Sequence, residues 1–153
     1  MRQTTLMAHV TTPVDSATLI LKLFELRREP VLREARAWFL RDFNPQSLED
    51  ALTLAGGPRN DWFRMVIGYW DMAASLVVHG AIDADMFRAA NTEMVATFAK
   101  LQPFLDDLRR ISKIPEFAAN IETVLQGQAG IEERLANLRD QFRKLAAAKQ
   151  MQP

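Results

Sequence analysis

One histidine and two aspartates at the junction of two expected helices have side chains that could perform acid–base or metal chemistry. His79 precedes Gly80, and Asp83 and Asp85 follow in a D-x-D pair. An imidazole beside a carboxylate can act as a general base, and paired carboxylates can share a hard cation. The same positions suit a helix end at His79 and a helix start at Asp83. We favour these structural roles, and therefore expect no catalytic residue, no metal site and no enzyme.

A concentration of aromatic side chains could instead bind a small molecule. Trp62, Met65 and Tyr69 are spaced to share one face of a helix, whereas Trp70 points elsewhere. Pockets lined by aromatic side chains are typical of ligand sites, although the same residues also fill hydrophobic cores. These four residues give one functional hypothesis, a small-molecule-binding regulatory protein with an aromatic-lined pocket between helices.

The C-terminal third carries the most regular pattern in the chain. Its core positions alternate between spacings of four and three residues, with one polar member, a heptad typical of coiled coils. They are Phe117, Ile121, Val124, Gln128, Ile131, Leu135, Leu138, Phe142 and Leu145. The heptad keeps its phase across Gly127 and Gly130, which favours one helix over residues 115–149. A turn at these glycines is the alternative, because each costs about 1 kcal/mol relative to alanine in a helix.

This long heptad leads to the principal functional hypothesis. A seam of this length is too long to bury fully on a small body, so we expect it to meet a partner. The chain is therefore predicted to be a non-enzymatic interaction module that forms a homodimer or binds another helical protein through Phe117–Leu145.

The other segments also carry apolar residues at helical spacing, without sustained two-residue alternation. We predict an all-α protein, a multi-helix bundle with a long C-terminal helix. A first helix capped by Asp15 or Ser16 should run to about residue 29. Others are expected over 30–43, 47–55, 61–79 and 83–108, the last kinked at Pro103. The predicted organisation is a flexible arm (1–13), a helical bundle (14–113) and a long helix (114–153) packed on the bundle or on a partner.

Composition excludes several classes of function. Lysine and arginine together number 19, as do aspartate and glutamate, so the basic excess of nucleic-acid-binding proteins is missing. The absence of cysteine excludes disulfides, thiolate nucleophiles and cysteine-ligated metals. No apolar stretch approaches the roughly 18 residues of a membrane span, and no signal peptide is evident, so we expect a cytoplasmic protein. Glycine-rich phosphate loops and zinc motifs are missing too, and no cofactor is expected.

Two segments carry a resemblance to a known family. Residues 68–87 read GYWDMAASLVVHGAIDADMF, and residues 103–109 read PFLDDLR. Together they resemble a bacterial family of unknown function: an apolar helix, a Gly-x-Ile/Leu-Asp joint, a second helix and a Pro-Phe-x-x-x-x-Arg ending. The resemblance covers about residues 68–109 and implies a helical domain with no catalytic residue to carry over. Many members look membrane-tethered by an N-terminal span, which this sequence does not contain.

Overall fold

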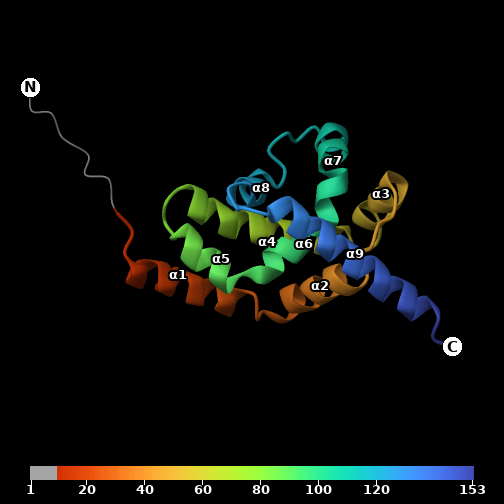
Figure 1. Ribbon diagram of the computed structural model, residues 1–153, viewed down its shortest axis with the longest axis horizontal. Coiled ribbons are helices and arrows are strands. Elements are labelled where there is room, and N and C mark those ends of the chain that lie inside the picture. The colour runs from red at the N-terminus through yellow and green to blue at the C-terminus, as the bar shows by residue number, and fades with distance from the viewer. Residues whose placement is uncertain (1–9) are drawn as a thin grey trace, which may run out of the picture.

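The computed structural model describes residues 10–153, so most of the arm predicted over residues 1–13 lies outside the described part. The described chain is all-α, as predicted (Figure 1). Its helices are α1 (Pro13–Leu26), α2 (Pro30–Arg41), α3 (Leu48–Gly56), α4 (Asn60–Val78), α5 (Ala84–Ala90), α6 (Thr92–Leu101), the 3₁₀ turn η1 (Gln102–Phe104), α7 (Leu105–Ser112), α8 (Ala119–Gln126) and α9 (Ile131–Gln150). Among these helices, none combines the length and the apolar character needed to cross a membrane.

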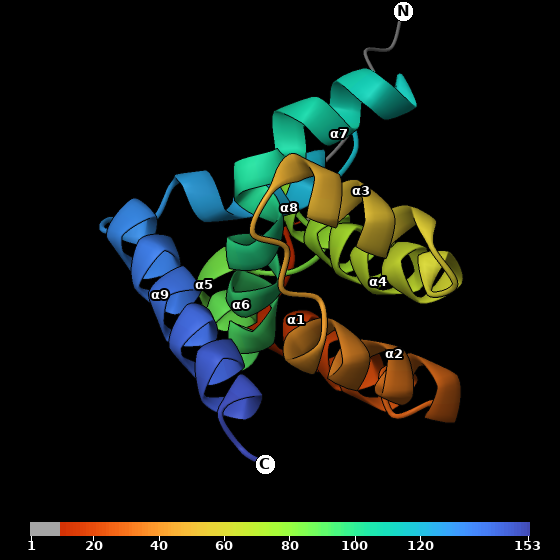
Figure 2. The same ribbon diagram turned by 90° about the vertical axis from the view of Figure 1, so that its right-hand side faces the viewer.

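Helix α4 lies at the centre of the fold. It packs against α2, α3 and α8, and Figure 2 shows it between α3 and α2. Trp70, Ala73 and Ala74 are completely buried on it, and the two alanines let neighbouring backbones approach closely. A hydrophobic cluster continues from Ile20 in α1 to Leu135 in α9, so the first and last helices share one core.

The junction after α4 has the predicted geometry. Gly80 has a φ of 78°, the left-handed conformation that a helix-ending glycine adopts without strain. The N–H of Ala81 donates to the carbonyl oxygen of Leu76 at 2.8 Å, which closes the last turn. The carboxylate of Asp83 accepts the N–H of Met86 at 2.8 Å and caps α5, as predicted. The residues of the joint therefore satisfy free backbone groups at the end of α4 and at the start of α5.

The first helix begins slightly earlier than expected. Pro13 is its first residue, and Thr12 rather than Asp15 or Ser16 is the N-cap. The Thr12 hydroxyl accepts the N–H of Asp15, whose carboxylate accepts the N–H of Thr12, both at 3.1 Å. Ser16 is instead fully buried, and its hydroxyl accepts the N–H of Asp83 at 2.9 Å. The predicted cap residue therefore ties α1 to the start of α5.

The single helix expected over residues 83–108 is divided into three. Asn91, with a φ of −125° and a ψ of 58°, separates α5 from α6. Its side-chain amide donates to the carbonyl oxygen of Phe87 at 2.9 Å and satisfies the end of α5. Pro103 lies in the 3₁₀ turn between α6 and α7, where the kink is expected.

The continuous helix predicted over residues 115–149 is wrong, and the alternative turn at Gly127–Gly130 is correct. Helix α8 ends at Gln126, and α9 begins at Ile131 after Gly130 with a φ of 72°. Helix α8 packs on α4, whereas α9 packs on α6. Each half of the heptad can bury its apolar face only if the chain changes direction between them, and the two glycines allow that turn.

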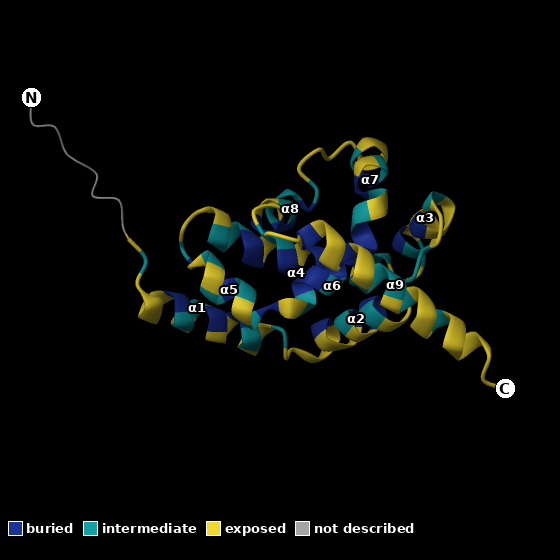
Figure 3. Cartoon of the chain, in the orientation of Figure 1, coloured by how far each residue is buried: buried dark blue, intermediate teal, exposed yellow. Residues whose placement is uncertain are grey.

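The predicted long C-terminal helix is present as α9. Its first turns bury Ile131 and Leu135, whereas Leu145 near its end is 62% exposed. Figure 1 and Figure 3 show the final turns projecting beyond the other helices with mostly exposed residues. Only the first part of α9 therefore belongs to the core.

Candidate functional site

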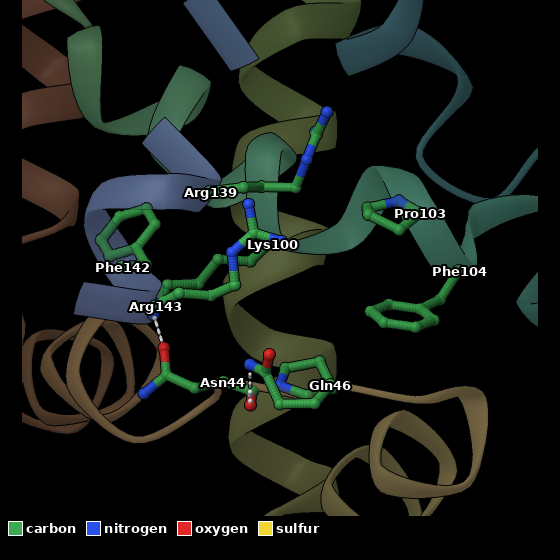
Figure 4. Close-up of a pocket in the computed structure, with 9 residues that line it drawn as sticks. Asn44, Gln46, Lys100, Pro103, Phe104, Arg139, Phe142 and Arg143 are labelled. Atoms are coloured by element: carbon green, nitrogen blue, oxygen red, sulfur yellow. Dashed lines mark hydrogen bonds between the residues drawn. The ribbon is translucent and has the colours of Figure 1, made fainter. Parts of the chain in front are cut away.

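A buried lysine stands out among the polar residues of the core. Lys100, in α6, is only 5% exposed, and lysine is rarely buried unless it is paired. Its Nζ donates to the carbonyl oxygens of Phe39 and Leu40, at 3.0 and 2.5 Å, and to Oδ1 of Asn44 at 2.9 Å. Figure 4 shows Lys100 together with Asn44 and the residues around it. An ammonium has three N–H donors, so all of them are used. Lys100 therefore caps the C-terminal end of α2 from a neighbouring helix.

The surroundings make the charge of Lys100 sensitive to pH near neutrality. Burial lowers its pKa from 10.5 to about 7; Asp42 acts to raise the pKa, and Lys149 acts to lower it. The Phe142 ring centroid lies 4.3 Å from Nζ, within range of a cation–π contact. A negative charge placed nearby would raise the pKa of Lys100.

A cavity of about 250 Å³ adjoins this lysine. Its walls come from the loop between α2 and α3, from α6 with η1, and from α9. They consist of Asn44, Pro45, Gln46, Lys100, Pro103, Phe104, Arg139, Phe142 and Arg143. Figure 4 shows Phe142 and Phe104 on opposite sides of the site. Three of these described lining residues are cationic and none is acidic, so the cavity is suited to an anion.

The two arginines of α9 bring like charges to the same cavity. Nη1 of Arg139 donates to Oε1 of Gln102 at 2.8 Å, which holds α9 against the end of α6. Burial lowers the pKa of Arg139, Glu132 acts to raise it, and Arg143 lowers it further. The Arg139 guanidinium nevertheless stays protonated, because arginine does not lose its proton in proteins. An anion between the two arginines would relieve their mutual repulsion.

A second cavity, of about 160 Å³, adjoins the first. The two share Asn44 and Phe142, and the lining surface of the second is mostly carbon. Its walls consist of Leu40, Arg41, Asn44, Phe142, Leu145, Ala146 and Lys149. A cationic cavity and an apolar one therefore lie side by side between α2 and α9.

The four aromatic-pocket residues predicted on α4 line neither of these cavities. Trp70 is fully buried, and its ring lies 5.0 Å from that of Tyr69. The Tyr69 hydroxyl donates to the carbonyl oxygen of Leu23 at 2.6 Å. Trp62 is half-buried beneath the guanidinium of Arg59, which lies 3.8 Å from its ring centroid. Met65 is also half-buried and packs against the core cluster. The structure thus places these four residues in the packing of α4, without a common described cavity.

The predicted interface residues are distributed over two helices and the segments before them. Ile121, Val124, Ile131 and Leu135 are buried in the chain's own core, and Phe117, Gln128, Leu138 and Phe142 are half-buried. Leu145 is the exposed member. Most of the seam therefore packs within the chain, and Phe142 lines both cavities.

The histidine and aspartates considered for catalysis are not brought together. Nδ1 of His79 lies 2.8 Å from the carbonyl oxygen of Ser75, and the side chain is exposed. Asp83 caps α5, and Asp85 forms an ion pair with Arg88 at 3.2 Å. Within residues 10–153, no group of three or more histidine, aspartate or glutamate side chains is arranged to hold a metal ion.

Sequence reasoning missed the residues that form the cationic cavity. One signal was available for Lys100, which lies among buried apolar residues at positions 94–101 and therefore occupies a core position. No comparable signal exists for Arg139 and Arg143, because they reach the cavity only through the packing of α9 on α6.

Comparison with known proteins finds no curated protein and no solved structure that matches the chain. One protein family, described as "Domain of unknown function (DUF4760)", matches residues 12–127. The match includes residues 68–109, so the resemblance to a family of unknown function is confirmed. It extends from the cap of α1 through α8 and ends before α9. The chain belongs to this family of domains of unknown function.

Proposed function

We propose that this protein binds a small anionic molecule in the cavity between the α2–α3 loop, α6 and α9. The observation that carries the proposal is the presence of Lys100, Arg139 and Arg143 around one cavity whose described lining contains no acidic residue. Clustered like charges in a recess raise the local concentration of counter-ions. The hypothesis of a small-molecule-binding regulator is thereby kept, with its site moved from the aromatic residues of α4.

Lys100 and Arg143 have different roles in this proposal. Lys100 supplies charge rather than hydrogen bonds, because all its donors are used by α2 and Asn44. Arg143 lies 3.7 Å from Asp140, a loose contact that leaves its donors available to a ligand. A guanidinium matches the two oxygens of a carboxylate or phosphate. The proposed role is binding without a catalytic step.

Isothermal titration calorimetry with inorganic phosphate and with butyrate tests the proposal. The variant Arg143→Gln should weaken binding of either anion about tenfold or more, because a charge-assisted hydrogen bond is lost. Arg134→Gln is the matched control, since Arg134 is exposed on the same helix and does not line the cavity. Equal affinities of the wild type and Arg143→Gln would contradict the site.

Self-association is a second candidate function, favoured by one observation. Leu145 is 62% exposed on the projecting end of α9. A homodimer, or a complex with another helical protein, would then use residues 138–145 rather than the whole predicted seam. Sedimentation equilibrium should show a dimer that Leu145→Glu dissociates and Gln150→Glu does not. A monomeric wild-type protein would exclude this homodimer.

A further inference from the structure

We infer that the anion bound in this cavity is the head group of an amphiphile, a fatty acid of medium chain length whose tail occupies the adjoining apolar cavity. This inference rests on the anion site proposed above and names the class of its ligand. The head group meets the cations of α6 and α9, and the tail lies between α2 and the last turns of α9.

The relation between the two cavities is the first argument. They share Asn44 and Phe142, so the two cavities adjoin at these side chains, and a ligand that fills both would pass between them there. Their chemistry differs, because the first is lined by three cations and the second mostly by carbon. A molecule that complements both must be negative at one end and apolar at the other.

Size is the second argument. Small-molecule sites in proteins begin at roughly 300 Å³. The cationic cavity, at about 250 Å³, and the apolar cavity, at about 160 Å³, each fall below this value. Together they exceed it. A ligand that fills both cavities therefore fits better than a small inorganic anion, which leaves the apolar one empty.

The charges at the two ends fix the orientation of the ligand. Two cations also border the apolar cavity, Arg41 and Lys149. Arg41 is already paired with Asp42 at 3.0 Å, and Lys149 is exposed on the last turn of α9. Screening by water weakens an exposed charge far more than a buried one. The carboxylate is therefore placed beside the buried Lys100 and the half-buried Arg139, and the alkyl chain runs along Phe142 toward Leu145.

The test compares ligands of equal charge and different length on the full chain. Calorimetric titrations use butyrate, decanoate below its micelle concentration, and decyltrimethylammonium as a cationic amphiphile. Decanoate should bind about tenfold tighter than butyrate or more, because burying each additional methylene is favourable. The cationic amphiphile should bind far more weakly than decanoate, since the cavity cations repel it.

Variants of two exposed residues distinguish the contribution of the ligand's tail to binding from that of its head group. Leu145→Asn should lower the affinity for decanoate severalfold and leave that for butyrate unchanged. Met151→Gln is its control, because Met151 is an exposed apolar residue outside the apolar cavity. Circular dichroism confirms that each variant is folded.

The possible outcomes distinguish this inference from the proposed function. Equal affinities for butyrate and decanoate would overturn the amphiphile and leave the anion site in place. Decyltrimethylammonium binding as tightly as decanoate would overturn it also, because contact with carbon alone would then explain the binding. If phosphate, butyrate and decanoate all fail to bind, both proposals are wrong.

Discussion

The ammonium of Lys100 lies 2.5 Å from the carbonyl oxygen of Leu40, so a cation on α6 caps the last turn of α2. Two further acceptors, the carbonyl oxygen of Phe39 and Oδ1 of Asn44, complete its shell. The same side chain borders the cationic cavity. The order of the α2 end and the charge of the site are therefore linked through one residue.

This burial predicts a rise in stability with pH. Burial lowers the pKa of Lys100 from 10.5 to about 7, so between these values the folded chain binds fewer protons than the unfolded chain. Stability contributed by this group is then lost as the pH falls from about 10.5 to about 7, by at most about 5 kcal/mol. Urea denaturation across this range measures the slope. Lys100→Met should flatten it, and the exposed Lys22→Met should not; equal slopes in both variants would contradict the assignment.

Anion binding should depend on pH in the opposite sense. A bound anion favours the protonated ammonium and raises the pKa of Lys100. Affinity should therefore decrease as the pH rises through about 7, with a proton taken up on binding near neutrality. Titration calorimetry at about pH 6 and about pH 8.5, in buffers of different ionisation enthalpy, detects both effects. An affinity that is independent of pH would show that the bound ligand does not change the pKa of Lys100.

The two glycines of the turn between α8 and α9 should respond differently to substitution by alanine. Gly130 has a φ of 72°, a conformation in which a side chain costs roughly 1 kcal/mol. Gly127 has a φ of −79°, which alanine adopts freely. Gly130→Ala should therefore lower the free energy of unfolding by about 1 kcal/mol, and Gly127→Ala should leave it unchanged or raise it slightly. Urea denaturation separates the two, and a Gly130→Ala variant more stable than the wild type would indicate a continuous helix.

A buried ion pair connects the helices that carry the site. Nε and Nη2 of Arg36 in α2 donate to the two carboxylate oxygens of Glu93 in α6, at 2.8 and 2.7 Å. Both side chains are mostly buried. Glu93→Gln should lower the free energy of unfolding by about 3 kcal/mol, because it leaves the guanidinium buried with a neutral partner. The matched control Asp85→Asn disrupts an exposed pair with Arg88 and should cost under about 0.5 kcal/mol. If the two variants lose comparable free energies of unfolding, the Arg36–Glu93 pair does not have this stabilising role.

Local patterns in the sequence predict much of the fold. The apolar period of residues 61–79 locates α4, and Gly80 with Asp83 defines the joint that follows. These features depend on neighbours in the sequence, which a local pattern records. The turn at Gly127–Gly130 depends instead on which helix each half of the heptad packs against, and an unchanged heptad phase carries no such information.

The candidate site was harder to predict for the same reason. Lys100 occupies an apolar position of α6, which a sequence pattern can show, but its acceptors come from the end of α2. Arg139 and Arg143 resemble ordinary surface residues of a charged helix. Only the docking of α9 brings them to the cavity, so tertiary packing rather than local pattern determines the site.

The end of α8 at Gln126 divides the wall of the cationic cavity between two stretches of the chain. The family match stops at residue 127, so the cavity wall with Lys100 lies inside the matched segment, and the wall with Arg139 and Arg143 lies beyond it. In the proposed site, a substitution at Arg143 would therefore alter the cations of the cavity and leave the matched segment unchanged. A change at Arg143 leaves α4 and its neighbours untouched, because the outer turns of α9 contribute little to the core. Lys100 differs, because it borders the cavity and also caps α2, so its replacement would alter both the proposed site and the fold.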